Sequence, residues 1–320
     1  MAIWLNETDV RAMLRMPELI GVIEAALAAF SSNRVTQPVR NVIETPGGFF
    51  ASMPTYNATS TAMGAKLVTV FHGNADRGLP SHLATIALLD PLTGALLAVM
   101  DGRYITEVRT AAVSAVAVRK LALEQSPALA IIGSGVQARS HLEALTLVRE
   151  FTDIRCWSPT REHLDNLVSE SSALPIRATP SAQVAAEGAD VIILVTASPT
   201  PVIANAWVKP GACVVSVGAC RPYQREMDPD LVARARLIVD SKAAALQESG
   251  DVVMGIRENK FGEQHIAAEL GEIVAGAKPG RTARDEVIVF KSLGLAVEDV
   301  AAAGLVYQRA IELGKGLPLA

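Results

Sequence analysis

The stretch that decides the fold reads Ala128-Leu-Ala-Ile-Ile-Gly-Ser-Gly-Val-Gln-Ala-Arg-Ser140. A short apolar run, typical of a buried strand, is followed by Gly-x-Gly-x-x-Ala and then by an amphipathic helical pattern. The glycines would let the backbone turn tightly and approach a pyrophosphate, which the helix N-terminus would attract. An ordinary strand-to-helix turn uses similar residues, but the strand and helix patterns on either side favour a dinucleotide site. The predicted cofactor contacts of this turn are Gly133, Gly135, Val136, Gln137 and Ala138.

From about residue 128 onward, apolar runs alternate with helical segments. Continuous apolar runs separated by helices are typical of a parallel sheet that is covered on both faces. We therefore predict an α/β fold with a doubly wound, Rossmann-type domain. Ile266–Val274 is predicted as a helix. The predicted strands are Ala128–Ile132, Asp153–Trp157, Pro175–Ala178, Val191–Thr196, Cys213–Val217, Leu237–Asp240 and Val287–Phe290.

The first part of the chain has a different pattern. Pro17 opens a helix with an apolar face, and the strand-like segments that follow suit an antiparallel sheet. The segment Asp90-Pro-Leu-Thr-Gly94 predicts a turn between two of these strands, and further helices are expected at about Thr106–Leu123 and at Leu295–Leu313. We predict an α+β domain for substrate binding and dimerisation, residues 1–118 with 295–320, and a dinucleotide-binding domain, residues 119–294. The predicted strands are Val39–Glu44, Phe49–Met53, Gly64–Phe71, Leu83–Asp90 and Ala95–Met100.

Composition and charge exclude several classes of partner. The chain has 320 residues, of which 50% are hydrophobic, and a formal net charge of -4 without a basic run. This disfavours nucleic acid and anionic membranes and favours small-molecule ligands. With no export signal and no membrane-length apolar stretch, a cytoplasmic location is expected. Cys156, Cys213 and Cys220 have no paired or metal-like spacing, so neither a disulfide nor a metal site is expected.

Three basic residues of the first part are candidates for chemistry: Arg40, Lys66 and Arg109. Lys66 lies in the apolar strand Gly64–Val70, where a cation that points into the core needs an anion as its partner. The alternative is a lysine that faces solvent on an edge strand. Arg109 begins a helical segment of small residues and could hold a carboxylate or phosphate through two parallel hydrogen bonds, or it could simply lie on the helix surface.

Ordered motifs along the whole chain resemble the ornithine cyclodeaminase and mu-crystallin family. The resemblance implies that the first domain and the terminal helix bind substrate and form a homodimer, that the central domain binds NAD(H) or NADP(H), and that Arg40, Lys66 and Arg109 form the substrate-carboxylate and catalytic cluster. The matching motifs are Gly64-x-Lys66, Asp90-Pro-x-Thr-Gly94, Asp101-Gly, Arg109-Thr-Ala-Ala, Gly133-x-Gly-x-x-Ala138, Val217-Gly-Ala, Arg225-Glu-Met-Asp228, Glu248-Ser-Gly-Asp251 and Phe290-Lys-Ser-x-Gly294.

The loop after Cys213–Val217 discriminates between the reactions of this family. The resemblance implies an Asp here in cyclodeaminases and related alanine dehydrogenases, where it exchanges protons with the substrate nitrogen or a water. This chain has Ala219 at that position, within Gly218-Ala-Cys-Arg-Pro222. This segment resembles the corresponding one of mu-crystallin and the ketimine reductases. The resemblance implies reduction of 1-pyrroline-2-carboxylate or 1-piperideine-2-carboxylate. Cys220 is more simply a small filler than a catalytic thiol.

The end of the second predicted strand bears on the choice of cofactor. An Asp or Glu there accepts from the ribose 2′-hydroxyl of NAD and repels a 2′-phosphate. This chain has Ser158, Thr160 and Arg161 instead, which favours NADPH, with NADH possible, although Arg161 could equally pair with Glu162 or Asp165 on the next helix. Thr110 and Thr196 complete the predicted cofactor contacts.

Two alternatives remain open from the sequence. One is an ornithine cyclodeaminase or amino-acid dehydrogenase in which Asp228 replaces the missing Asp, although Asp228 looks like the cap of the next helix. The other is a binding protein that holds a carboxylate ligand on an NADPH-loaded fold.

Overall fold

This computed structural model describes residues 1–319. The strand that precedes the Gly133 turn lies inside a parallel sheet, with neighbouring strands on both sides. Within those residues the sheet has eight strands in the order β10-β9-β8-β11-β12-β15-β13-β14, all paired in parallel. The order reverses at β8, as in doubly wound folds that bind dinucleotides, so this prediction is confirmed. The strands are β8 Ala128–Ile132, β9 Asp153–Trp157, β10 Ile176–Ala178, β11 Val191–Leu194, β12 Cys213–Ser216, β13 Arg236–Val239, β14 Ile266–Glu269 and β15 Ile288–Lys291.

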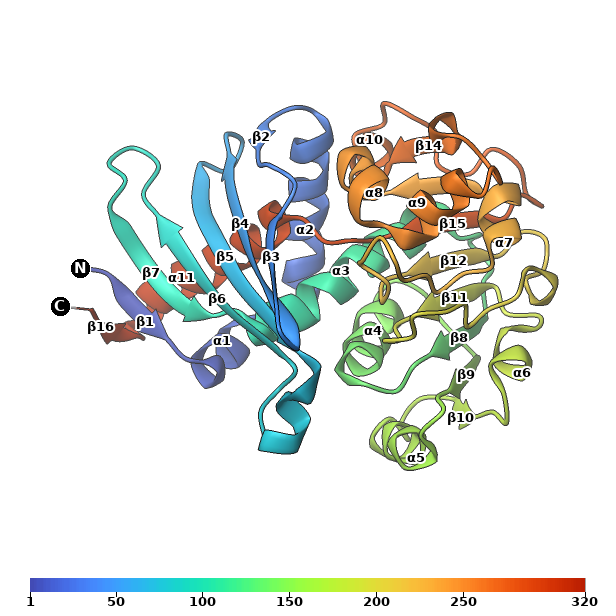
Figure 1. Cartoon of the computed structure of the whole chain (residues 1–320). Coiled ribbons are helices and arrows are strands. Elements are labelled where there is room, and N and C mark those ends of the chain that lie inside the picture. The colour runs from blue at the N-terminus through green and yellow to red at the C-terminus, as the bar shows by residue number, and fades with distance from the viewer. Residues whose placement is uncertain (320) are drawn as a thin grey trace. The chain divides into compact units, whose positions relative to one another are not determined.

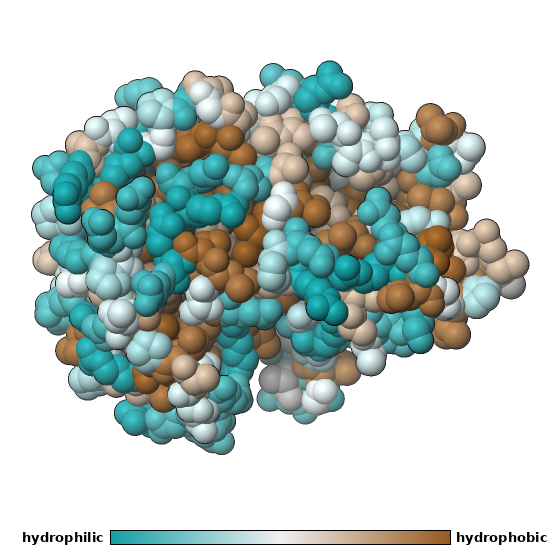
Figure 2. All heavy atoms as spheres, turned by 180° about the vertical axis from the view of Figure 1, so that it is seen from behind, coloured by the Kyte–Doolittle hydropathy of each residue, from teal (hydrophilic) through white to brown (hydrophobic). Residues whose placement is uncertain are grey.

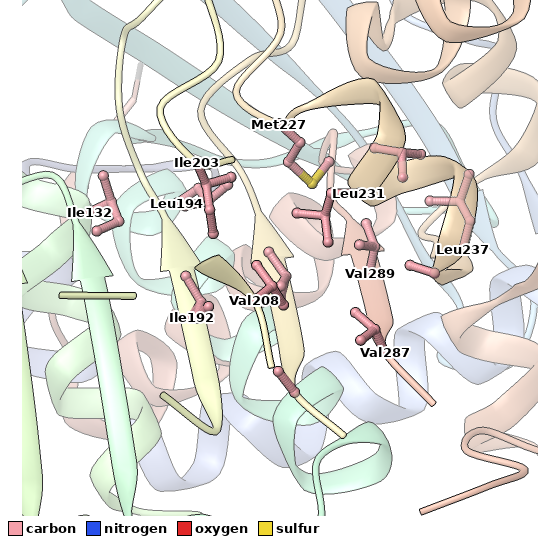
Figure 3. Packing of buried hydrophobic residues seen from close by; sticks show 14 of the residues in the cluster. Ile132, Ile192, Leu194, Ile203, Val208, Met227, Leu231, Leu237, Val287 and Val289 are labelled. Carbon is pink, nitrogen blue, oxygen red and sulfur yellow. The ribbon is translucent and has the colours of Figure 1, made fainter. Parts of the chain in front are cut away.

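The central strands of this sheet are buried along their whole length, because their residues are apolar without alternation. Figure 3 shows how one face packs: Ile192 and Leu194 of β11 and Val289 of β15 contribute to a cluster that also contains Met227 and Leu231. This close packing fixes the strand ends from which the loops of the site emerge.

Helices connect the strands of the parallel sheet. The prediction of a helix over Ile266–Val274 is wrong in its first half, where β14 pairs in parallel with β13, and Leu237 lies opposite Ile266. The run Ile266-Ala-Ala suits either structure, and pairing with the edge of the sheet decides it. The helices are α4 Val136–Thr146, α5 Arg161–Glu170, α6 Ala182–Ala186, α7 Pro229–Arg234, α8 Lys242–Glu248, α9 Gly250–Arg257 and α10 Leu270–Val274.

The first part of the chain forms a second sheet, which Figure 1 shows with helix α11 lying across it. In the described residues the order is β16-β1-β7-β6-β5-β4-β2, and β3 also pairs with β4. The meander β4 to β7 is antiparallel, as predicted, and the turn at Asp90 joins β6 to β7. The elements are β1 Ile3–Leu5, α1 Glu7–Met13, α2 Met16–Ser31, β2 Val35–Thr36, β3 Asn41–Thr45, β4 Gly48–Asn57, β5 Ala62–Phe71, β6 His82–Leu89, β7 Leu96–Asp101, α11 Ala296–Leu313 and β16 Leu317–Pro318.

One face of this second sheet is covered by helix α11, which also packs against α2. The predicted apolar face of α2 is buried, with Leu19, Ile23 and Leu27 fully enclosed. Along β5 and β6, residues alternate between the covered face and the opposite face, because successive side chains of a strand point to opposite sides.

The edge of this sheet holds two strands that the sequence did not indicate, β1 and β16. They pair in antiparallel fashion, with Ile3 opposite Pro318, and the amide of Leu319 donates to the carbonyl of Ala2 at 2.8 Å. Ala2 and Leu319 therefore lie side by side, and Figure 1 shows β1 next to β16.

The described residues form two compact units. The first comprises Met1–Arg109 with the residues from Gly294 onward, and the second comprises Thr110–Leu293. The division between the units falls inside helix α3, Arg103–Leu121, nine residues before the boundary predicted at 118/119. An uninterrupted helix carries no local signal of such a boundary.

The surface mixes hydrophilic and hydrophobic side chains in small groups on the face that Figure 2 shows. Among the helices of residues 1–319, none combines the length and apolarity needed to cross a bilayer.

Candidate functional site

The Lys66 side chain is buried, and its partner is a carboxylate from the far end of the chain. Its position on β5 turns it to the covered face of the sheet, where it is 2% exposed. Lys66 Nζ lies 2.6 Å from Asp299 Oδ2 in the first turn of α11. The solvent-facing alternative for Lys66 is therefore excluded by the structure.

Arg109 converges on the same turn of helix α11. Its Nε donates to Asp299 Oδ1 at 3.0 Å and its Nη1 donates to Glu298 Oε2 at 2.8 Å. All three side chains are buried, so these are ion pairs in a region of low dielectric. Asp299 thus joins Lys66 to Arg109.

Arg40 reaches this cluster through Gly294. Arg40 Nη2 donates to the Gly294 carbonyl at 3.3 Å. Gly294 has φ +85°, and a Cβ built there would overlap the guanidinium of Arg109. Only glycine fits this position, because its backbone lies against two arginines. The structure therefore brings together the three basic residues predicted from the sequence, and we call Arg40, Lys66, Arg109, Glu298 and Asp299 the cation cluster.

The charges of the cation cluster do not cancel. Three basic and two acidic side chains leave one excess positive charge, which suits an anionic ligand. Burial lowers the pKa of Lys66 to about 8, with Asp299 opposing the shift and Arg109 adding to it. Burial raises the pKa of Asp299, but Arg109 and Lys66 outweigh it and hold that pKa below its usual range.

His82 faces the same side of the sheet as Lys66, and sequence reasoning missed it. Its register places it with Ala84 and Ile86 on the covered face, and Ile86 lies opposite Lys66. Burial, together with the charges of Lys66 and Arg109, lowers the pKa of His82 to about 4. The imidazole is therefore neutral at physiological pH.

The glycine turn lies in the second unit, between β8 and α4. Gly133 has φ +124°, and a Cβ there would lie 2.5 Å from the Val195 carbonyl oxygen. Ala138 is fully buried, as its role in close helix packing requires. The predicted strand, turn and helix are thus all present.

The N-terminus of α4 is open to a ligand. Gly135 is its N-cap and has no side chain that could accept a hydrogen bond from the first N–H groups of the helix. A Cβ built on Gly135 would meet no protein atom within 4 Å. Val136 is 52% exposed, and Gln137 Oε1 is a buried acceptor without a hydrogen-bond partner in the described residues. The helix N-terminus and the space beside Gly135 fit a pyrophosphate, whereas Gln137 Oε1, an acceptor, would need a donor from another part of the ligand.

The residues predicted to determine the preference for NADPH over NADH follow β9. Ser158 is half-buried, and Thr160 is the exposed N-cap of α5, without a side-chain bond to it. Arg161 opens α5 with an exposed side chain, paired with Asp165 through Nε to Oδ2 at 2.9 Å. Arg161 thus pairs with Asp165 on its own helix. Because its side chain is exposed, this pairing is also compatible with the predicted contact to a 2′-phosphate.

Three further residues considered in the sequence analysis, Ala219, Cys220 and Asp228, lie in or after the loop that follows β12. Ala219 is 1% exposed, and Cys220 is half-buried. Asp228 is the N-cap of α7: Oδ1 accepts from the Asp230 amide and Oδ2 from the Asn205 amide, both at 2.9 Å. Each oxygen of this carboxylate accepts a local backbone amide, as expected of a helix cap, and this disfavours Asp228 as a substitute for the missing Asp.

The two predicted threonines differ in their surroundings. Thr196 follows β11, and its amide and hydroxyl both donate to Glu226 Oε1 at 2.8 Å. Thr110 is buried in α3.

Sequence reasoning assigned no role to Glu226, Glu298 or Asp299. Each is a carboxylate with no exposed surface. The position of Glu298 and Asp299 among apolar residues in the sequence was the signal that could have indicated a role, because charged side chains are rarely buried without a partner.

Comparisons with known proteins agree along the whole chain. The model of the ornithine cyclodeaminase/mu-crystallin family matches residues 2–314. The chain is 46% identical over 310 residues to the ketimine reductase mu-crystallin of Mus musculus, covering 95% of this chain and 96% of that protein.

Two solved structures share the fold closely. One is Thermococcus litoralis Delta(1)-pyrroline-2-carboxylate reductase in complex with NADH and L-proline, with TM-score 0.96 and 38% identity, covering 99% of this chain and all (100%) of that one. The other is an archaeal alanine dehydrogenase dimer with bound NAD, with TM-score 0.96 and 30% identity, covering 100% and 99%.

Proposed function

Because the chain belongs to the ornithine cyclodeaminase/mu-crystallin family, we propose that it reduces a cyclic ketimine carboxylate to the cyclic amino acid with NAD(P)H. The substrate class is 1-pyrroline-2-carboxylate or 1-piperideine-2-carboxylate. The observation that carries the proposal is the convergence of Arg40, Lys66 and Arg109 around Gly294 and Asp299. In this proposal the first unit holds the substrate and the second unit holds the cofactor.

The proposed reaction adds one hydride and one proton across the C=N bond. The imine carbon receives the hydride, the ring nitrogen receives the proton, and the π bond is lost. A bound reduced nicotinamide supplies the hydride. Lys66 Nζ supplies the proton, because a pKa of about 8 leaves it protonated near neutral pH yet able to give the proton up.

The cation cluster anchors the substrate carboxylate. Arg40 and Arg109 supply guanidinium groups, and the single excess positive charge of the cluster matches one carboxylate. Glu298 and Asp299 position the cations, since their bonds to Arg109 and Lys66 fix both side chains before substrate binds.

The second unit fits a nicotinamide dinucleotide. The open N-terminus of α4 would hold the pyrophosphate beside Gly135, and the left-handed Gly133 would make the tight turn. Ser158, Thr160 and Arg161 would hold a 2′-phosphate, so NADPH is the preferred cofactor and NADH also serves.

Deamination of ornithine is disfavoured by the loop after β12. Ala219 offers no carboxylate, and both Asp228 oxygens accept local backbone amides. An imine that is already formed needs only a hydride, a proton and a carboxylate anchor: the cofactor would bring the hydride, and the cation cluster would supply the proton and the anchor.

A panel of cyclic imino acids assayed with NADPH and NADH tests the proposal. We expect oxidation of NADPH with a five- or six-membered ring and a smaller kcat/KM with NADH. Ammonia release from ornithine and NAD would contradict it in favour of a cyclodeaminase. Tight binding of a carboxylate ligand without any turnover of the imines would favour a binding protein.

We also propose a homodimer formed through the face of the antiparallel sheet of the first unit that lies opposite helix α11. Cross-strand register places Ile43, Tyr56, Leu67 and Leu83 on that face, and they are 56%, 37%, 46% and 38% exposed. Neighbouring exposed apolar side chains of this size mark an interaction surface. Light scattering after gel filtration tests it: Leu67→Glu should give a monomer, whereas Leu92→Glu, in the exposed Asp90 turn, should leave a dimer.

The proposed place of this reaction is the cytoplasm, where reduced nicotinamide is available and cysteines stay reduced. In residues 1–319, Cys156, Cys213 and Cys220 are all free thiols.

A further inference from the structure

A second buried group of charges lies in the second unit, apart from the cation cluster. Glu226, Asp251 and Lys291 are each at most 2% exposed, and with Ser216 we call them the Glu226 group. No role was predicted for any of these three residues, which come from three of the matching sequence motifs: Arg225–Asp228, Glu248–Asp251 and Phe290–Gly294. Burial of three charges is costly, so their arrangement requires an explanation.

The Glu226 carboxylate accepts five hydrogen bonds from two separate loops and the strand between them. Oε1 accepts from the Thr196 amide and the Thr196 hydroxyl, both at 2.8 Å. Oε2 accepts from the Gly218 amide at 2.6 Å, the Ser216 hydroxyl at 3.1 Å and the Ala219 amide at 3.2 Å. One side chain therefore fixes the loop after β11 and the loop after β12 together.

Asp251 and Lys291 hold Glu226 in place. Asp251 Oδ1 accepts from the backbone amides of Glu226 and Met227, both at 3.0 Å. Lys291 Nζ lies 3.3 Å from Asp251 Oδ2 and donates to the Ser216 hydroxyl at 3.1 Å. Ser216 in turn donates to Glu226, which closes the network.

The loops that Glu226 fixes follow the carboxyl ends of β11 and β12. In doubly wound sheets, dinucleotides bind outside the carboxyl ends of the strands, and the two halves of the ligand lie on opposite sides of the point where the strand order reverses. Here β9, with Ser158 and Arg161 after it, lies on one side of β8, and β11 and β12 lie on the other. The adenosine half belongs to the first side, and the nicotinamide half belongs to the side of Thr196 and Gly218.

We propose that Glu226 is a positioning residue that holds the Thr196 loop and the Gly218–Ala219 loop in the arrangement that binds the nicotinamide half of the cofactor. This inference rests on the proposed function. Gly218 supports it, because a Cβ there would overlap both the Thr196 carbonyl oxygen and the Glu226 carboxylate. The two loops and the carboxylate are thus packed with no room for a side chain between them.

A carboxylate is required at this position because every neighbour is a donor. A glutamine would turn an NH₂ group towards either the Thr196 pair or the Gly218 and Ala219 amides, leaving at least one buried N–H without an acceptor. Because an unsatisfied buried N–H is costly in free energy, we expect the loops to move out of the arrangement that Glu226 holds.

The test separates the two halves of the ligand. Titration calorimetry measures binding of NADPH and of adenosine 2′,5′-bisphosphate, which carries only the adenosine half, to the intact chain and to Glu226→Gln. We expect the Kd of NADPH to rise about ten-fold or more and that of the bisphosphate to stay within about two-fold. Ser216→Ala, which removes one donor and leaves the carboxylate, should shift the NADPH Kd in the same direction by about three-fold.

Asp190→Asn provides the matched control. Asp190 also accepts a backbone amide, that of Ala128 at 2.9 Å, but at the amino end of β8 and β11. It should change neither Kd. Equal weakening of both ligands by Glu226→Gln, or an unchanged NADPH Kd, overturns the inference. Failure of the unaltered chain to bind NADPH overturns the proposed function instead, so the two failures are distinguishable.

Discussion

Lys66 Nζ lies 2.6 Å from Asp299 Oδ2, and both side chains are almost completely buried, at 2% and 0% exposure. A buried ammonium is retained only where a carboxylate faces it, and this one shares that carboxylate with Arg109. The pair keeps a titratable proton in the core of the first unit.

Replacement of Lys66 by methionine should abolish most of the imine reduction. Met fills a similar volume but holds no proton, and loss of a proton donor lowers kcat/KM by about 10²–10⁴-fold. Asp299 keeps Arg109 as its partner, so the fold should persist in circular dichroism. Lys260→Met, at an exposed lysine, is the control and should leave kcat/KM unchanged. Full activity of Lys66→Met would rule out the assigned role.

The pH profile of kcat/KM should fall on the alkaline side with a midpoint at about 8. Burial lowers the pKa of Lys66 to about 8, and only the protonated amine can donate, so activity is lost as the pH rises through that value. On the acid side His82, with a pKa of about 4, should contribute no change between pH 5 and 8.

Asp299→Asn should move that alkaline limb to lower pH. The Asp299 charge raises the pKa of Lys66 against the effect of burial, and its removal lets the pKa fall further. Measuring both proteins with the same imine cancels the substrate's own ionisation. An unchanged midpoint would show that the limb belongs to another group.

Arg161→Ala should reduce the preference for NADPH. Loss of the guanidinium removes a partner of the 2′-phosphate, so KM for NADPH should rise about ten-fold while that for NADH changes little. Arg177→Ala, at an arginine that is 57% exposed on β10, should alter neither value. Equal effects of Arg161→Ala on both cofactors would refute the assignment.

Lys291→Met should destabilise the protein strongly. It leaves Asp251 buried without its counter-charge, and breaking a buried ion pair from one side costs about 3–5 kcal/mol. Urea unfolding measures this free energy. Lys291→Met with Asp251→Asn should recover part of it, because the uncompensated charge is then gone. A loss below about 1 kcal/mol for the single variant would mean that Asp251 is not ionised in the native state.

Local patterns were sufficient to predict the elements on which the site depends. The Gly133 turn, strand β8 and helix α4 follow from glycine geometry and from the periodicity of neighbouring residues. What could not be predicted depends on contacts between distant residues. Arg109 and Asp299 are 190 positions apart, and only the folded sheet shows that they meet. Likewise the segment Ile266–Glu269 forms a strand because it pairs with β13. The partners of Glu226 follow from the same long-range packing.

The pairing of β1 with β16 has a consequence for engineering. Since Ala2 and Leu319 are hydrogen-bonded neighbours, a short glycine-rich linker between these two residues would leave the sheet undisturbed. A circularly permuted chain could then begin and end at the turn around Leu92, which is 93% exposed. Such a permutant would leave the polypeptide from β8 to α11 uncut and so keep the Glu226 group in one continuous segment, whereas Arg40 and Lys66 of the cation cluster would then follow Asp299 in the chain.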